Sequence, residues 1–559
     1  MSSNSTSSGQ SSINVNFEIG TDVNNAAVEV QNRVSIAQPS LPDAVRRLGL
    51  TVRKRNPSIM VALAFYSPNG THDATFIGNY ANIYVKDALQ RVKGVGDIVS
   101  RADDFGMRIW LDPEKLANLG MATTDILSSL TEQNLQVAGG TVGGNPQPAA
   151  QAFEYSVLTN SRINTKEQFE NIIVKTVPAT GTLVYLKDVA RVELGRFDYS
   201  TNAYTDGKPA AFILIYLAPG ANAIATFDGI LKTLGELKKS FPKDIDYKMP
   251  LETVTVVKAS IKEVLHTLFI ALLLVIFVVF LFLQSWRATL IPILAIPVSL
   301  IGTFIFFIPF GFTINTLTLF AFVLAIGIVV DDAIVVVEAV QHYIDHEKIS
   351  PLEATQKAMK DISGPVIAIA LILTAVFVPV GFLPGIVGRL YQQFAITIAI
   401  SVVISAFVAL SLTPALCSTM LRPSKGENEK KNILEKFFAF FNRGFNWVNR
   451  NYTKGVGRWI KLTPLVLIMM ICLFVGLYYM FQHKPTGFIP SEDEGRLYVT
   501  YEMQEGASTT RNKTMLLDIQ QRLTSIPGVQ TVGRLAGPNI ISFSHKSNVR
   551  TIFLLLKPW

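Results

Sequence analysis

The stretch from residue 314 to residue 340, INTLTLFAFVLAIGIVVDDAIVVVEAV, constrains the fold more than any other part of this sequence. As an α-helix it is long enough to cross the hydrocarbon core of a bilayer, which is about 30 Å thick. Asp331 and Asp332 lie just past its middle. A carboxylate at that depth costs about 2.5 to 3.5 kcal/mol, so it usually faces a helix bundle or a water-filled path for ions or protons. We therefore expect a membrane protein in which this Asp pair has a function.

The two carboxylates point in different directions. Neighbouring helical residues are separated by about 100°, so Asp331 and Asp332 contact different neighbours but still interact. Because like charge and poor solvation both disfavour double ionisation, such a pair can hold and release a proton near neutral pH. The alternative is structural: a hydrogen bond to a Ser or Thr of a packed helix, or the core helix of a soluble protein. Glu338, seven residues after Asp331, is either a relay step or, more simply, an acid near the membrane surface.

The sequence contains six apolar stretches of membrane-spanning length. They cover residues 261–283, 290–312, 314–340, 365–383, 394–416 and 462–481. The chain as a whole is 49% hydrophobic, but its two ends are polar. The fold class that we predict is a polytopic α-helical membrane domain joined to soluble α+β parts.

Residues 422–461 carry much of the net charge of +8, with ten Lys or Arg against three Glu. By the positive-inside rule this loop is cytoplasmic. Since the number of spans is even, both polar ends then lie outside, in the periplasm of a Gram-negative cell. Aromatic residues alternate with cations in residues 433–452, which favours a helix on the membrane lipid surface over a nucleic-acid site.

The soluble parts alternate short apolar strands with amphipathic helices, a pattern typical of ferredoxin-like (split βαβ) units. We predict a first unit with strands at 13–19 and 59–66, helices at 23–37 and 80–92, and a hairpin at 94–113. A second unit would use strands at 171–177, 182–194 and 210–217, and the order strand, helix, strand returns at 496–503, 509–523 and 528–535. Residues 136–151 are rich in Gly, Pro and Ala and form either a linker or a protruding arm.

These patterns divide the chain into five segments. We assign 1–258 to a periplasmic porter and docking region, 259–421 to membrane helices, 422–461 to the basic cytoplasmic loop, 462–483 to a further span, and 484–559 to the start of a second periplasmic half.

An intramembrane carboxylate that drives a conformational change needs a cationic partner. The other spans offer only Lys262 and His266, which lie too near one end to reach Asp331. We therefore expect the partner, and the missing export signal, in further sequence of a longer protein. Cys417 and Cys472 lie in apolar spans and suggest neither a disulfide framework nor a thiolate metal site, and no cofactor is expected.

Several motifs resemble the resistance-nodulation-division (RND) efflux pumps of the hydrophobe/amphiphile branch, along essentially the whole chain. They are GTDVNNAAVEVQNRV, GVGDIV, FGMRIWLDP, QNLQVAGGTVGG, FLFLQSWRATLIPILAIPVSLIGTF, INTLTLFAFVLAIGIVVDDAIVVVE and FIPSEDEG. By this resemblance the chain lacks the first membrane helix of the family and the last five.

The resemblance implies an inner-membrane homotrimer that uses inward proton movement to export amphiphilic drugs, together with a periplasmic adaptor and an outer-membrane channel. Asp331 and Asp332 match the proton-relay pair of the family, whose lysine partner lies on a helix absent from this sequence. Residues 137–151 match an arm that reaches into the neighbouring subunit, and residues near Gly181 match the part that faces the outer-membrane channel.

The substrate path of the family is matched less well. Its aromatic positions fall on Ile59 and Arg101, whereas Phe553 matches a pocket phenylalanine. A less aromatic pocket with a cation leads to the hypothesis that acidic or amphiphilic substrates are exported.

Four alternative functions are weighed against this hypothesis. A metal-ion exporter of the same fold usually spaces its acids apart, and no Met pair or His cluster is visible in the soluble part. An intramembrane aspartyl protease needs a second Asp on another helix, so an enzyme is not expected. A lipid-sensing receptor and a fragment without activity are further alternatives.

Overall fold

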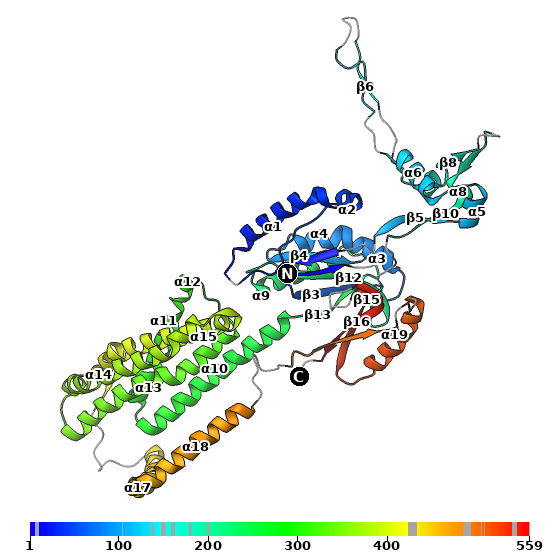
Figure 1. Cartoon of the computed structure of the whole chain (residues 1–559). Coiled ribbons are helices and arrows are strands. Elements are labelled where there is room, and N and C mark those ends of the chain that lie inside the picture. The colour runs from blue at the N-terminus through cyan, green and yellow to red at the C-terminus, as the bar shows by residue number, and fades with distance from the viewer. Residues whose placement is uncertain are drawn as a thin grey trace. The chain divides into compact units, whose positions relative to one another are not determined.

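The computed structural model describes most of the chain. The described residues are 1–5, 11–18, 20–102, 104–135, 139–146, 152–157, 162–177, 181–197, 199, 202–422, 433–484, 493–504, 506–507, 509–538 and 545–557. They belong to two compact units, one formed by Met1–Val254 with Asp493–Trp559 and the other by Thr255–Glu492 (Figure 1).

An eight-stranded sheet forms the centre of the first unit, with the order β13-β3-β12-β11-β15-β16-β14 and β4 paired to β12. Its strands are β3 Ile59–Tyr66, β4 Val95–Arg101, β11 Ala203–Thr205, β12 Lys208–Leu217, β13 Asp246–Glu252, β14 Arg496–Glu502, β15 Val529–Pro538 and β16 His545–Leu556. The pairings along it are antiparallel. Residues before and after the membrane spans therefore share one sheet.

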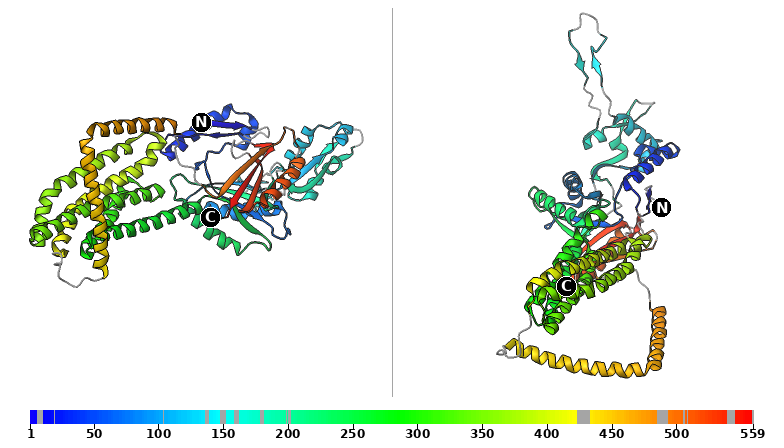
Figure 2. Two further views of the ribbon diagram at one scale, coloured as in Figure 1. Left: turned by 90° about the horizontal axis from the view of Figure 1, so that it is seen from below. Right: turned by 90° about the vertical axis from the view of Figure 1, so that its left-hand side faces the viewer.

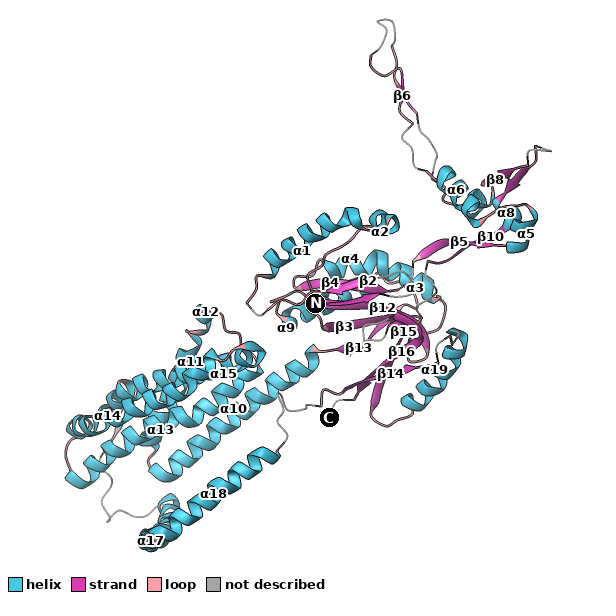
Figure 3. Ribbon diagram, in the orientation of Figure 1, coloured by secondary structure: helices cyan, strands magenta, loops and turns pink. Residues whose placement is uncertain are grey.

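Helices cover one face of β3 and β12 (Figure 3). They are α3 Ala74–Tyr80, the π-helical turn Ala81–Lys86, α4 Asp87–Gln90 and α9 Ala223–Lys238. Phe65 and Ile213 point into this core, whereas Ala64 and Phe212 point to the opposite face, and all four are fully buried. Because both faces of these strands are covered, their sequences are apolar throughout instead of alternating.

The sheet curls around its second face. A Cβ atom added to Gly533 of β15 would lie 2.5 Å from Cβ of Pro250 in β13, although these strands are not neighbours in the sheet. We call the buried residues enclosed by this curl the inner-face cluster. Its members are Ala62, Ala64, Ala203, Ala210, Phe212, Leu214, Tyr216, Leu251 and Phe553. The outer face of β15 and β16 packs against α19 Thr509–Thr524 through Leu516, Val532 and Ile552.

Residues 105–196 form a separate core within the first unit. The ribbon of β5 Phe105–Leu111 and β10 Ala190–Arg196 leads into it. Its other elements are α5 Pro113–Asn118, α6 Thr123–Gln133, β6 Thr141–Val142, β7 Tyr155–Ser156, α7 Lys166–Glu170, β8 Ile173–Thr176, β9 Leu183–Tyr185 and α8 Leu186–Val189. The N-terminal elements are β1 Ser2–Ser5, β2 Ser11–Asn14, α1 Val23–Ala37, the 3-10 turn Gln38–Ser40 and α2 Asp43–Leu48.

Four strand predictions are corrected. The hairpin expected at 94–113 is wrong, because β4 pairs with β12 and β5 pairs with β10. The strand expected at 210–217 belongs to the first sheet, not to a second unit, and a helical turn, α8, interrupts the strand expected at 182–194. The strand expected at 13–19 is β2, which ends at Asn14. Long-range pairing with β12 decided the first two cases, and alternation in sequence does not encode it.

The second unit is helical. Its helices are α10 Val254–Leu283, α11 Trp286–Phe304, α12 Phe307–Phe310, α13 Thr316–Glu347, α14 Pro351–Phe377, the 3-10 turn Val378–Phe382, α15 Gly385–Leu410, α16 Leu412–Met420, α17 Ile433–Lys461 and α18 Thr463–His483. In the described part of the chain, six helical segments are long and apolar enough to cross a membrane. The prediction of a polytopic helical membrane protein is confirmed.

Two helix ends in this unit follow directly from side-chain chemistry. Asn315 Oδ1 accepts a hydrogen bond from the Thr318 amide, and Thr318 Oγ1 accepts one from the Asn315 amide, so a reciprocal cap starts α13. The second is the C-terminal end of α10, where Gln284 and Asn442 of α17 exchange two hydrogen bonds of 2.6 and 3.1 Å. Phe282 contacts Phe441 and Phe445 edge to face beside them. Figure 2 shows α17 as one long continuous helix.

Candidate proton and substrate sites

The helix α13 is the core helix of the second unit. Its residues contribute to each of the three hydrophobic clusters found there. Asp332 lies on the buried side of this helix and is 7% exposed. Its carboxylate accepts a hydrogen bond of 2.7 Å from the hydroxyl of Ser405 in α15. The structural alternative considered from the sequence, a bond from a neighbouring Ser, is thus present at Asp332.

Asp331 lies on the other side of α13 and is exposed. It belongs to a row of exposed residues at helical spacing, which we call the α13 stripe: Phe320, Leu324, Asp331, Val335 and Glu338. The two carboxylates therefore have different surroundings, as expected from their spacing. Glu338 shares the stripe with Asp331, two turns further along.

Ser405 is the functional candidate that the sequence reasoning missed. It ends a row of buried hydroxyl groups on α15, at Thr397, Ser401 and Ser405. Ser401 Oγ lies 3.1 Å from Thr303 Oγ1 of α11. The available signal was the four-residue spacing of these hydroxyls in an otherwise apolar span, which places them on one helix face.

Within the described residues, neither Asp331 nor Asp332 forms an ion pair with a Lys or Arg. Lys262 and His266 lie in the first half of α10 and are exposed. The described His, Cys, Asp and Glu residues do not form a group of three that could hold a metal ion.

The three residues predicted for the substrate path come together in the first unit. Phe553 is 1% exposed and belongs to the inner-face cluster, and Ile59 packs against that cluster. Arg101 stands opposite Phe212, another member of the cluster, in the pairing of β4 with β12. Strands far apart in sequence thus bring these three side chains to one face of the sheet.

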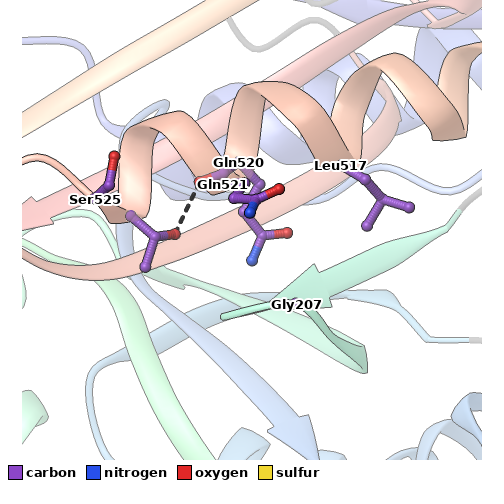
Figure 4. Close-up of a pocket in the computed structure, with 6 residues that line it drawn as sticks. Gly207, Leu517, Gln520, Gln521 and Ser525 are labelled. Atoms are coloured by element: carbon purple, nitrogen blue, oxygen red, sulfur yellow. Dashed lines mark hydrogen bonds between the residues drawn. The ribbon is translucent and has the colours of Figure 1, made fainter.

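A shallow hollow lies elsewhere on this unit, between α19 and the turn that joins β11 to β12 (Figure 4). Gly207, Leu517, Gln520, Gln521, Thr524 and Ser525 line it. Thr524 Oγ1 donates a hydrogen bond to the carbonyl oxygen of Gln520 within the helix. The hollow contains none of the predicted substrate-path residues.

The expected intersubunit arm and channel-facing tip lie only partly within the described residues. Residues 137–138 and 147–151 of the arm fall outside them, as do residues 178–180 beside Gly181. The described part of the arm contains β6, which pairs with β7.

Comparison with known proteins gives the family. Residues 1–559 match the profile of the AcrB/AcrD/AcrF family. The chain is 41% identical over 562 residues to the multidrug resistance protein MdtF of Escherichia coli K12, covering 100% of this chain and 54% of that protein. It is 40% identical over 565 residues to the multidrug export protein AcrF of Escherichia coli K12, with the same coverage. It is 38% identical over 561 residues to the toluene efflux pump membrane transporter TtgB of Pseudomonas putida, covering 100% of this chain and 53% of that protein.

The chain thus spans about half the length of these curated relatives. It belongs to the AcrB/AcrD/AcrF family of RND multidrug efflux transporters.

Proposed function

We propose that this chain is part of a longer inner-membrane transporter that exports amphiphilic compounds in exchange for protons. The names of the relatives, which describe multidrug export and toluene efflux, support transport over catalysis. The observation that carries the proposal is the placement of Asp331 and Asp332 on one membrane-spanning helix, with one carboxylate buried and the other exposed.

In this proposal Asp331 and Asp332 take up and release the transported proton. Asp332 is held by Ser405, so its carboxylate has a fixed position in the helix bundle. Asp331 lies on the α13 stripe, where a basic residue from the rest of the full-length protein would pair with it. Protonation would weaken that pair and allow the packed helices to shift, because a charge at this depth is stable only while it is paired. Glu338, on the same stripe, is an accessory candidate.

The soluble part would bind and release the substrate. The strand order β13-β3-β12-β4, with helices on one face, supports a ferredoxin-like porter subdomain. In the sequence, the core at 105–196 is inserted between β4 and β12 of this subdomain. We assign 1–258 and 484–559 to periplasmic porter halves, 259–421 and 462–483 to the membrane, and 422–461 to the cytoplasmic loop. Ile59, Arg101 and Phe553 mark the substrate path.

The assembly that fits this assignment is a homotrimer in the Gram-negative inner membrane, with a periplasmic adaptor and an outer-membrane channel. The arm at residues 137–151 would contact the neighbouring subunit. The aromatic contacts of α17 with the end of α10 support a helix that lies on the cytoplasmic membrane surface.

The test of proton coupling is export by the full-length protein in cells without other pumps of this family. We expect Asp331→Asn and Asp332→Asn each to reduce efflux of the neutral dye N-phenyl-1-naphthylamine to the level of cells with an empty vector. An amide has the size of the carboxylate but cannot take up a proton in this range.

Asp345→Asn is the matched control, because Asp345 is an exposed residue near the end of the same helix and interacts with Gln341. It should leave efflux unchanged. Normal efflux by membrane-inserted Asp331→Asn protein would rule out the proposed relay.

A further inference from the structure

Three arginines gather beside one edge of the curled sheet. Arg53 and Arg55 precede β3, and Arg101 ends β4; we call these three residues the arginine cluster. Asp97 of β4, whose side chain is 5% exposed, pairs with two of them. Its Oδ1 lies 2.5 Å from Arg53 Nη1 and its Oδ2 lies 3.4 Å from Arg55 Nη1. One buried carboxylate therefore pairs with two of the three guanidinium groups.

In the described part of the chain, Arg101 forms no ion pair with the Asp97 carboxylate. Its Nε is buried and has no hydrogen-bond partner among the described residues. Burial lowers the pKa of Arg101; Tyr216 opposes this change, and the neighbouring charge of Arg55 adds to it. Since arginine remains protonated in proteins, the cluster holds a poorly solvated positive charge, which is costly unless an anion pairs with it.

The cluster borders an apolar surface. The Arg55 guanidinium lies 4.1 Å from the centroid of the Tyr216 ring, and Tyr216 is a member of the inner-face cluster. Val99, between Asp97 and Arg101 on β4, packs against the same cluster and is only partly buried, as is Ile59. Positive charge and apolar contact area thus lie side by side, and the side chain of Arg55 is 34% exposed.

We propose that the arginine cluster binds the anionic head group, a carboxylate or sulfonate, of amphiphilic substrates whose apolar body contacts the partly buried side chains of Ile59 and Val99. Planar guanidinium groups bind such oxygens through paired hydrogen bonds. This inference rests on the proposed function and names its substrate class. It makes Arg101 the main determinant of preference for anions, with Arg55 as a second contact.

The test compares two probes with the same aromatic body. N-phenyl-1-naphthylamine is neutral, and 8-anilinonaphthalene-1-sulfonate carries an added sulfonate. Binding of each is measured by fluorescence on the full-length protein in nanodiscs. We expect Arg101→Gln to weaken binding of the sulfonate about tenfold, the usual effect of losing a charge-assisted hydrogen bond, and to leave binding of the neutral probe unchanged. Arg101→Lys keeps the charge and should restore most of the affinity.

Arg91→Gln is the matched control, because Arg91 is an exposed arginine at the end of α4 and outside the cluster. If Arg101→Gln protein is not recovered in folded form, the more exposed Arg55→Gln carries the test, with the same selective loss expected. Equal affinity of wild type and folded variant for the sulfonate, or an equal loss for both probes, would overturn the inference. Failure of the proposed function would give a different result. The wild-type protein would then bind both probes in nanodiscs but export neither probe from cells.

Discussion

At the scale of single residues, the Asp332–Ser405 hydrogen bond links the core helix of the membrane unit to α15. Ser405 is 2% exposed, and its Oγ also lies 3.2 Å from the carbonyl oxygen of Val329. The hydroxyl has one proton, so donating to Asp332 and donating to Val329 are alternatives. A hydroxyl with two acceptors can change its donor direction when the carboxylate takes up a proton.

Ser405→Ala should therefore impair transport without unfolding the protein. Loss of a hydrogen bond to a carboxylate is worth about 1.5 to 3 kcal/mol, so we expect efflux of N-phenyl-1-naphthylamine to fall by about tenfold. Ser405→Thr, which keeps the hydroxyl, should retain more activity than Ser405→Ala. Efflux assays in cells with matched amounts of membrane protein measure both.

The control for this residue is Ser411→Ala. Ser411 is an exposed serine just after α15, and its hydroxyl donates to the carbonyl oxygen of Phe407 in its own helix. Its removal should leave efflux near the wild-type rate. Equal efflux by Ser405→Ala and wild type would show that the hydrogen bond has no part in transport.

At the scale of helices and strands, the sequence predicted which segments are regular but not which segments pair. Apolar runs gave β3 and β12, and helical periodicity gave α1 with its observed bounds Val23–Ala37. The partner of β4 was missed because β12 follows it only after the inserted core at 105–196. Strand pairing over such a distance depends on packing of the whole sheet, and a local pattern does not contain it.

The candidate sites likewise contain some residues that the sequence alone predicts and others that only the fold identifies. The carboxylates at Asp331 and Asp332 were found because charge within an apolar helix is visible in sequence alone. Ser405 was not found, because a hydroxyl is compatible with a membrane helix and becomes notable only when its neighbour is known. The pairing of Asp97 with two arginines likewise joins segments that only the fold brings together.

The curl of the sheet depends on a close approach at Gly533. A Cβ atom there would lie 2.5 Å from Cβ of Pro250 and 3.3 Å from Cζ of Phe212. Gly533→Ala should therefore force β13 and β15 apart and lower the free energy of unfolding by about 1 to 3 kcal/mol, as other overpacked cores do. Thermal unfolding of the purified full-length protein measures the change.

Gly235→Ala provides the comparison. Gly235 lies within α9, and a Cβ atom there meets no other atom within 4 Å. Alanine should stabilise this helix slightly, by about 1 kcal/mol at most. A Gly533→Ala protein as stable as wild type would mean that the curl opens without cost.

At the scale of the whole molecule, the chain combines a unit of mixed strands and helices, built from residues on both sides of the membrane spans, with a helical unit. In the proposed exchange of protons for substrate, the second unit would change its packing when a proton binds. In this unit the α13 stripe leaves Asp331 exposed within a membrane-spanning helix, although more than half of the most apolar stretch of the same helix is buried. A carboxylate so placed in a bilayer is costly until another helix covers it.

Residues 1–559 produced alone should therefore insert into the membrane but export nothing. The reason is that the stripe would face lipid instead of a basic partner, so protonation of Asp331 would change no helix contact. Efflux of N-phenyl-1-naphthylamine from cells that produce this chain should equal that of empty-vector cells, whereas the full-length protein should clear the dye. Production of the remaining sequence as a second polypeptide should restore efflux if the two parts associate. Export by the chain alone that is lost on Asp331→Asn would show instead that these residues contain a complete proton pathway.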